Sequence, residues 1–398
     1  MQAGNYEIER FTLADPEGNQ AGVVVAKATY VLGDDRILVP AEDKEPVRFA
    51  ALPIEGDDPA ASPIMFDSDS VLAKAMTDVV VHGTAYAPKG RPVPSFDVEV
   101  TVGKARRVLR VFGPRHASWR KPSRQTKKET IFRTPVFSEP EPVASVPLNF
   151  TRAYGGTARY ELPGGEDVIE IPCPSNPLGM GYCVQNSRAG LDGLELPQIE
   201  DPGALLTPES VVRRIGAPED LPLPVGFGVY AAAWYPRVAF AGVMPFQIDE
   251  ARERIREQAA DLDPEKDAEA IAMLEGFEPP VMDPRFHQSA APGMTFPILA
   301  GDEALAFRNM TPGGMLTFNL PGVRPLLRLE TGAGRLTLPT VLDTVVFLVD
   351  DMKLVLTFRG KCVLSQLNEG DEFSALPMEV EDIDVRAYEK VLVEEGIG

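Results

Sequence analysis

Proline is the residue that most constrains the fold of this chain. The sequence has 38 prolines among 398 residues, nearly double the usual share of about 5%, and they are spread along the whole length between short apolar runs. Because proline lacks a backbone donor and interrupts both helices and central strands, this distribution disfavours a helical bundle. We therefore predict a mainly β protein, built from antiparallel sandwich or barrel-like sheets with Greek-key or meander connections.

Hydrophobic patterning locates several of these strands. Residues 23–32 form a β-branched run, and over 96–102 the valines alternate with polar residues. A period of two is typical of a strand with one face on the core and one in water. Gly103-Lys104 then predicts a tight turn into a return strand over 108–112. Further strands are expected at 79–81, 315–320, 326–329, 345–349 and 353–358, the last two joined across Asp350-Asp351.

One helical insertion is expected near 247–276. Asp263 is the predicted N-cap, with Pro264 in the first helical position, and Gly276 is placed to end the helix. The expected organisation is a β-rich body over 1–360 followed by an acidic C-terminal segment over 361–398. The loop-rich stretch 140–235 marks the break if the body has two subdomains.

The spacings that carry common catalytic chemistry are missing from the sequence. There is no G-x-x-x-x-G-K-[ST], no G-x-S-x-G and no H-E-x-x-H. Adjacent acids such as Glu200-Asp201 would point to opposite faces of a strand. The three histidines lie far apart in the sequence: His82, His116 and His287. We therefore predict no catalytic residues, no cofactor and no metal.

Cysteine usage and the absence of targeting segments predict a cytoplasmic protein. No apolar run approaches the ~20 residues that span a bilayer, and the N-terminus lacks the basic and apolar regions of a signal peptide. Cys173, Cys183 and Cys362 are expected to be buried thiols, with a Cys173–Cys183 bridge as the alternative. No membrane contact is predicted.

Charge is distributed unevenly along the chain. The formal net charge is -20, yet residues 104–133 carry eleven basic residues and one acidic residue, whereas 369–395 carries ten acidic and two basic residues. Either these regions pair with each other or remain solvated, or an exposed basic loop reaches an acidic face of a partner. The residues predicted to make that contact are Arg120, Lys121, Arg124, Lys127 and Lys128.

Two glycine-containing loops are further candidates for partner binding. They contain positions where the backbone takes positive φ or approaches another segment closely. Such loops serve either as recognition surfaces or as turns that the architecture requires. The residues concerned are Tyr154, Gly155, Gly156, Asn176, Pro177, Gly179 and Gly181.

An ordered set of sequence blocks resembles a known bacterial family. The blocks include SDSVLAKAMTDVVVHGTAYAP (68–88), VPLNFTRAYGG (146–156), NPLGMGY (176–182), DPRFHQSAAP (283–292), LAGDEALAFRNMTPGGMLTFNLPG (299–322) and DTVVFLVDDMKLVLTFRG (343–360). Together they resemble a family of unknown-function domains encoded beside type VI secretion spike and effector genes, over roughly residues 5–360.

The resemblance implies an effector adaptor or chaperone, not an enzyme, that binds a secreted toxin and helps load it onto the spike complex. Its implied partners are that toxin and a spike or tip protein. A chain of net charge -20 repels nucleic acid, so no direct nucleic-acid binding is predicted, and a cationic client such as a nuclease toxin fits better. The alternatives are a carbohydrate-active β-sandwich enzyme and a structural accessory of the secretion baseplate.

Overall fold

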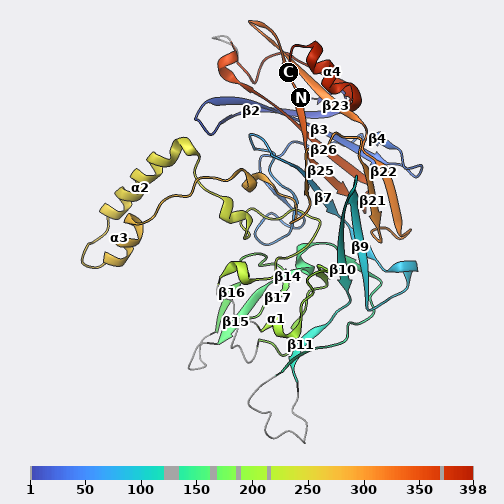
Figure 1. The fold of residues 1–398 in the computed structure, drawn as a ribbon, viewed down its shortest axis with the longest axis vertical. Helices are drawn as coiled ribbons and strands as arrows, with labels where there is room; N and C mark the ends of the chain where they lie inside the picture. Colours follow the sequence, from blue (N-terminus) through green and yellow to red (C-terminus); the bar gives the residue numbers. More distant parts are fainter. Residues whose placement is uncertain are drawn as a thin grey trace, which may run out of the picture.

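Two β-sheets that pack against each other form the centre of the molecule (Figure 1). The computed structural model describes residues 2–120, 134–161, 168–184, 190–212, 217–367 and 372–397. The larger sheet has the strand order β1-β2-β3-β26-β25-β7-β20, with β4 paired to β3. Its strands are β1 (Gln2–Ala3), β2 (Tyr6–Ala14), β3 (Gln20–Leu32), β4 (Leu38–Pro40), β7 (Thr77–His82), β20 (Thr295–Phe296), β25 (Thr340–Leu348) and β26 (Lys353–Val363).

The second sheet has five strands in the order β19-β10-β9-β21-β22. They are β9 (Ser95–Val102), β10 (Ala105–Phe112), β19 (Ile199–Glu200), β21 (Ala304–Arg308) and β22 (Met315–Asn319). Aromatic rings join the two sheets: Phe307 and Phe318 lie 4.9 and 5.0 Å from Phe347 of β25, between ring centroids. The inward side chains of β9 are buried in the same core, as the alternating pattern predicts.

The prediction of a mainly β fold is confirmed. The predicted hairpin also forms, because β9 and β10 pair antiparallel across Gly103, whose φ is +55°. Most pairs in the two large sheets are antiparallel, but β25 and β7 pair in parallel. No sheet in the described part of the chain closes on itself.

Smaller sheets and one short helix build a lower region with its own core (Figure 1). Its buried residues run from Ala117 to Leu221 and include Cys173 and Cys183, so it overlaps the loop-rich stretch 140–235. Its elements are β11 (His116–Trp119), β12 (Pro135–Phe137), β14 (Tyr154–Gly155), β15 (Thr157–Glu161), β16 (Val168–Pro172), β17 (Met180–Gly181), β18 (Leu194–Glu195) and α1 (Pro208–Val211).

The acidic C-terminal segment folds onto the upper end of the molecule (Figure 1). β27 (Met378–Asp384) pairs with β23 (Val323–Thr331), which also pairs with β24 (Gly334–Leu338). α4 (Val385–Glu394) buries Tyr388 and Leu392 in a small core there. β26 runs to Val363, so the expected boundary at residue 360 falls within a strand. The remaining strands are β5 (Leu52–Pro53), β6 (Ile64–Phe66), β8 (Thr84–Tyr86) and β13 (Ser145–Pro147).

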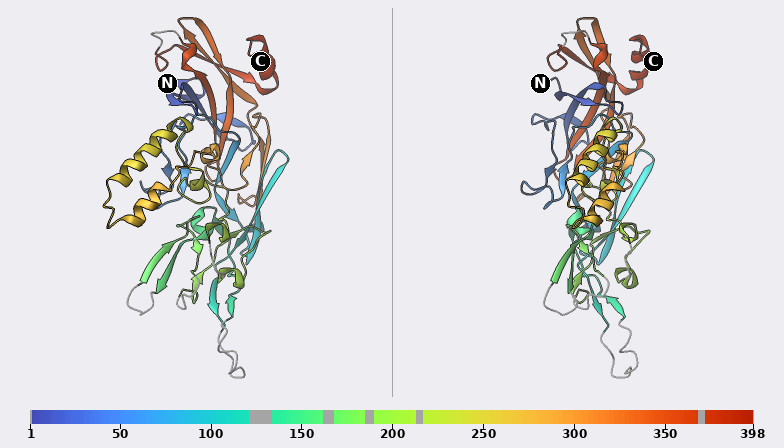
Figure 2. Two further views of the ribbon diagram at one scale, coloured as in Figure 1. Left: turned by 60° about the vertical axis from the view of Figure 1, so that its left-hand side comes forward. Right: turned by 90° about the vertical axis from the view of Figure 1, so that its left-hand side faces the viewer.

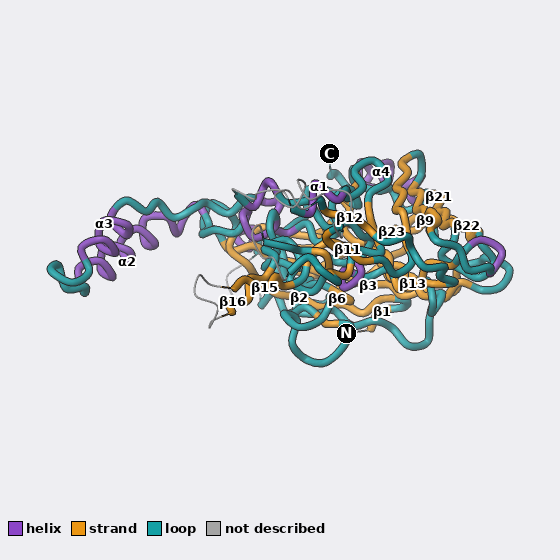
Figure 3. Tube along the Cα trace, turned by 90° about the horizontal axis from the view of Figure 1, so that it is seen from below, coloured by secondary structure: helices purple, strands orange, loops and turns teal. Residues whose placement is uncertain are grey.

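The helical insertion forms a hairpin of two helices, α2 (Ile248–Ala260) and α3 (Ala268–Glu275), which projects away from the sheets (Figures 2 and 3). The predicted helix start at Asp263-Pro264 is wrong. Asp263 accepts a hydrogen bond from the backbone N–H of Glu265, and its carbonyl accepts from Asp267, so this sequence makes the turn between the helices. Asp267 is the N-cap of α3, and Gly276 ends it as predicted.

The cysteines and the helices agree with two further predictions from the sequence. The three cysteines are free and buried, as expected of reduced thiols. Within the described residues, no helix is long and apolar enough to cross a membrane.

Candidate protein-interaction surface

The two glycine loops meet inside the lower region. β14 and β17 pair in parallel, with Tyr154 opposite Met180 and Gly155 opposite Gly181. Gly155 has a φ of +145°, and a Cβ added there would lie 2.1 Å from the carbonyl oxygen of Asn176. Only glycine can occupy such a position without moving the backbone.

Asn176 ties these loops together from within. Its buried side-chain amide donates to the carbonyls of Phe150 at 2.8 Å and Tyr154 at 3.0 Å. The ring of Tyr154 is buried as well. Pro177 and Gly179 are half-buried. These contacts have the form of turns that the architecture requires, and partner binding at this cluster stays a prediction.

The described part of the basic stretch is largely paired within its own sheet. On β10, Arg106 bonds to Glu99 at 2.6 Å, and Arg110 bonds to Asp97. Arg120 is exposed, just beyond β11, where that strand pairs with β12. Lys121, Arg124, Lys127 and Lys128 lie outside the described residues.

The acidic C-terminal segment forms its ion pairs at the other end of the molecule. Arg328 of β23 bonds to Glu381 at 2.5 Å and to Glu395 at 2.9 Å. In Figure 1, α4 lies at the top and β11 at the bottom. Among the described residues no ion pair joins the basic stretch to this segment.

A network of charged and polar side chains lies buried beside the larger sheet. Lys74 Nζ donates to Asp78 Oδ2 at 2.7 Å and to Thr344 Oγ1 at 2.9 Å. Asp78 also accepts from the backbone N–H of Ser289 and from the side-chain amide of Gln288, each at 2.8 Å. These residues come from three sequence blocks, 68–88, 283–292 and 343–360, which the fold brings together.

The central pair of this network is held in its charged form. Burial alone would lower the pKa of Lys74, but the carboxylates of Asp78 and Asp343 outweigh it and raise the pKa. Burial alone would raise the pKa of Asp78, but Lys74 and the hydrogen bonds from Ser289 and Gln288 lower it. The adjoining cavity is about 20 Å³, room for about one water. This network joins segments of the fold and leaves no space for a substrate.

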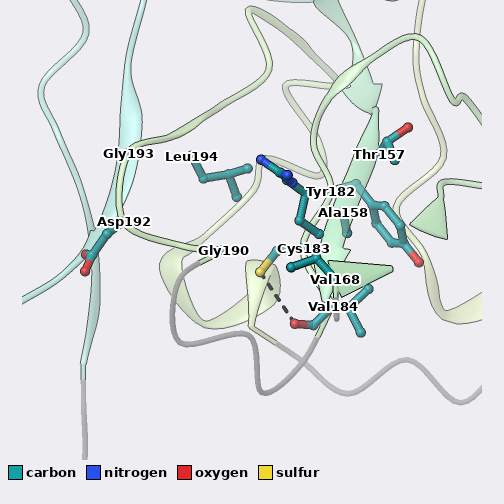
Figure 4. A pocket seen from close by; sticks show the side chains of 11 residues that line it. Thr157, Ala158, Val168, Tyr182, Cys183, Val184, Gly190, Asp192, Gly193 and Leu194 are labelled. Atoms are coloured by element: carbon teal, nitrogen blue, oxygen red, sulfur yellow. Dashed lines mark hydrogen bonds between the residues drawn. The ribbon is translucent and has the colours of Figure 1, made fainter. Parts of the chain in front are cut away.

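A larger pocket of about 460 Å³ opens in the lower region (Figure 4). Tyr182, Cys183 and Leu194 line it, and the thiol of Cys183 donates to the carbonyl of Val184 at 3.7 Å. Burial raises the pKa of Cys183, which disfavours the nucleophilic thiolate. No histidine lines the described part of this pocket, and its one described carboxylate, Asp192, accepts from the backbone N–H of Trp119 at 2.8 Å.

The residues weighed as acids or metal ligands have other partners. Glu200 is buried, pairs with Arg115, and accepts from the backbone N–H of Leu206 at 2.7 Å. Asp201 is exposed and accepts from the backbone N–H of Gly203. The ring of His82 is buried, with Nε2 2.8 Å from the carbonyl oxygen of Met65. Within the described residues no group of three or more His, Cys, Asp or Glu side chains is placed to hold a metal ion.

The helical hairpin, residues 244–281, contributes few buried side chains to the fold, and we call it the arm. Its two ends are clamped to each other: the N–H of Val243 donates to the carbonyl of Pro280 at 2.9 Å, and the N–H of Met282 donates to that of Val243 at 3.0 Å. Beneath it, Arg237 bonds to Asp67 at 2.5 Å and to the carbonyls of Tyr230 and Phe286. The two segments that flank the arm are thus joined to each other and, through Arg237, to Asp67 of the body.

Beyond that base the arm buries almost nothing. Ala259 is the one buried residue of α2, and α3 has none. Met273 is 76% exposed and Phe277 is 50% exposed. Met273 lies in the last turn of α3, and Phe277 follows directly after its C-cap, Gly276. The arm therefore presents apolar surface that the rest of the described chain leaves uncovered.

The arm is also strongly acidic. Residues 249–278 include eleven acidic and four basic residues, a net charge of -7. All four basic side chains pair with acids of the arm itself, for example Arg252 with Asp249 and Arg254 with Glu250. The remaining acids leave a negative surface around the exposed apolar side chains.

A family model described as "uncharacterized protein conserved in bacteria" (DUF2169) matches residues 17–359. The chain belongs to this bacterial family. Comparisons with curated proteins and with solved structures found no match. The DUF2169 match includes the five-stranded sheet, the lower region, the arm and the larger sheet from β3 onward. β1 and β2 precede the match, which ends within β26, so β27 and α4 lie beyond it. The expected resemblance to a bacterial family of unknown-function domains is confirmed, and the type VI gene setting stays a prediction.

The sequence predicts a helical insertion near 247–276, but it does not predict that the insertion is exposed. The signal lay in the composition of α3, where six of eight residues are apolar: Ala268, Ala270, Ile271, Ala272, Met273 and Leu274. An ordinary surface helix keeps its apolar residues to one stripe that faces the core. A helix with more than one stripe points to a second surface that it contacts.

Proposed function

We propose that this DUF2169 protein is a cytoplasmic adaptor or chaperone without catalytic activity, which binds a secreted toxin and helps load it onto the spike complex of a type VI secretion system. The proposal extends the resemblance of the sequence blocks to proteins encoded beside spike and effector genes. Its partners are the toxin and a spike or tip protein.

The helical arm is the observation that carries this proposal. A segment of about thirty residues with a single buried side chain in its helices adds little to the stability of the body. Its base, by contrast, is fixed by backbone hydrogen bonds and by Arg237. A projection whose ends are joined at its base and which exposes apolar and acidic side chains suits contact with another protein.

The partners of the ionisable residues also favour an adaptor over the carbohydrate-active alternative. A glycosidase needs two carboxylates facing a cleft. Here Glu200 is buried against Arg115, and Asp78 is buried against Lys74. The Cys183 thiol faces a pocket but has a raised pKa. The contacts of each of these groups are better explained by a role in stabilising the fold than by a role in catalysis.

The overall charge favours a cationic client. A protein of net charge -20 attracts a basic partner over long range and speeds their encounter. In a nuclease toxin, such binding would also cover the surface that meets phosphates. The electrostatic part of this attraction weakens with salt.

The test is co-expression with the toxin encoded by a neighbouring gene, followed by size-exclusion chromatography at low and high salt. We expect one complex peak whose yield falls as salt rises. A toxin encoded beside a different family member serves as the matched control. Separate elution at low salt would refute the adaptor proposal. Turnover on a glycan or ester panel that E200Q or D201N abolishes would favour the enzyme alternative.

A further inference from the structure

Helix α3 is apolar on nearly all sides, yet no side chain of it is buried. Six of its eight residues are apolar, a composition that normally belongs to a helix enclosed by protein. Ile271 and Leu274, on the side where α3 contacts α2, are only half-buried. The hairpin itself therefore accounts for part of the apolar surface and leaves the rest open to water.

The uncovered apolar side chains include Ala270 and Met273 of α3 and Phe277 just after its C-cap, and we call these three the α3 stripe. A spacing of three residues places Ala270 and Met273 on one side of the helix. Phe277 follows in the turn that ends the helix, where its N–H donates to the carbonyl of Leu274 at 3.1 Å. Methionine adapts to differently shaped partners, and a half-exposed phenylalanine can supply an aromatic anchor in an interface. This stripe has the composition of a docking site.

Several acidic side chains of the arm lie near the stripe in the sequence, and three of them make no ion pair with any described residue. Glu269 and Glu275 lie on α3, and Glu265 lies in the turn before it. Every residue of the arm is described, and no ion pair engages any of these three. At the far end, Glu257 and Asp261 lie in or just after the last turn of α2, which holds no basic residue. Together with the net charge of -7, these acids make the arm favour a cationic neighbour.

We propose that the α3 stripe binds an amphipathic segment of the cargo, whose apolar side covers Met273 and Phe277 and whose lysines and arginines meet the surrounding acids. The inference rests on the proposed function in taking the cargo to be the toxin. A second copy of this chain fits the stripe poorly, because it would bring two arms of net charge -7 together.

The first experiment measures binding of a synthetic Leu/Lys amphipathic helical peptide by fluorescence anisotropy. We expect M273E/F277E to weaken the peptide's Kd by at least about tenfold. V393E is the control, because Val393 is 69% exposed on α4 and the substitution places a new negative charge far from the arm, one where M273E/F277E adds two. It should leave the Kd within about twofold. A Leu/Glu peptide of the same pattern should bind neither protein.

The second experiment repeats the toxin co-elution with the same variants and with a protein whose residues 245–279 are replaced by a short Gly-Ser link. Val243 and Val281 are bridged, so a short link can join them. Complexes that form equally well with M273E/F277E and with the arm-less protein would overturn the inference while leaving the adaptor function standing. Peptide binding at the stripe without toxin co-elution would refute the adaptor function and leave standing the preference of the stripe for a cationic amphipathic segment.

Two further outcomes would also overturn the inference. One is a Kd for the Leu/Lys peptide that M273E/F277E leaves unchanged. The other is dimerisation of the wild-type protein, seen by sedimentation and abolished by M273E/F277E, which would assign the stripe to a second copy. Circular dichroism and thermal unfolding of each variant establish that the body is folded in every case.

Discussion

The arm and the buried network around Lys74 contain the same kinds of residue and use them in opposite ways. In the network, Lys74 and Asp78 are almost entirely shielded from water and meet at 2.7 Å. In the arm, Arg254 and Glu250 make a similar pair at 2.5 Å, but both side chains are largely exposed. The distances are alike, and the surroundings differ.

Those surroundings decide what each pair does for the protein. Water and salt screen the arm's pairs, which contribute at most about 1 kcal/mol each. Around Lys74, a lost partner leaves a charge stranded without water, which costs several kcal/mol. The network therefore stabilises the fold, whereas charged residues of the arm can be substituted at little cost in stability and can be matched to a partner.

The largest expected effect comes from breaking the buried pair. D78A removes the carboxylate that Lys74 and the donors of Gln288 and Ser289 all contact. We expect the free energy of unfolding to fall by about 3–5 kcal/mol in urea titrations. The matched control is E250A, which breaks the exposed pair with Arg254 and should cost at most about 0.5 kcal/mol. Equal losses in the two variants would remove the contrast between network and arm.

The second prediction concerns His82, whose burial lowers its pKa to about 4. Unfolding restores an ordinary pKa of about 6.5, so between these values the unfolded chain binds the proton and the folded protein does not. Stability is therefore fully present above pH ~6.5 and is lost as pH falls toward 4, by up to about 3 kcal/mol. In urea titrations from pH 7 to 4.5, H82Q should show a flatter profile than the wild type. Parallel profiles would mean that His82 is not the group responsible.

The third prediction tests whether the glycine loops are architectural. N176A would remove the amide donor from the buried carbonyl of Tyr154 and leave that of Phe150 with only the N–H of Ala153 at 3.3 Å. An unsatisfied buried group costs about 1–3 kcal/mol, so thermal unfolding should shift to lower temperature. N149A, which removes a half-buried acceptor for the N–H of Thr151, is a milder control from the same region. Lost toxin binding in N176A at unchanged stability would favour the recognition alternative instead.

Local sequence patterns predicted the parts of the fold that local interactions decide. The alternation over 96–102 and the turn at Gly103 specify the β9–β10 hairpin, because both act between neighbouring residues. The helix start was misplaced for a related reason. Asp263 and Asp267 are both suitable N-cap residues. The helix begins after Asp267, because Asp263 forms hydrogen bonds within the turn between α2 and α3.

The site depends on contacts that no local pattern encodes. Lys74 and Thr344 are 270 residues apart in the chain, and only the pairing of β25 with β7 brings their segments together. In the same way, Met273 looks like an ordinary core residue of a helix until the fold places α3 on a projecting arm. Burial is a property of the whole fold, so sequence reasoning found the arm but not its exposed stripe.

The smallest expected effect on stability belongs to the basic segment. Reversing Arg120, Lys121, Arg124, Lys127 and Lys128 to glutamate should change the free energy of unfolding by at most about 1 kcal/mol, the usual value of surface charge pairs. Arg120 itself is exposed, and the acidic C-terminal segment is occupied with Arg328 at the opposite end of the molecule. If the segment reaches an acidic face of a partner such as the spike protein, the same five changes should still weaken that complex. Pull-down with the spike and the toxin separately shows which partner responds. Unaltered capture of both would leave these residues as a solvated surface, and the arm as the single charged region with a role in binding.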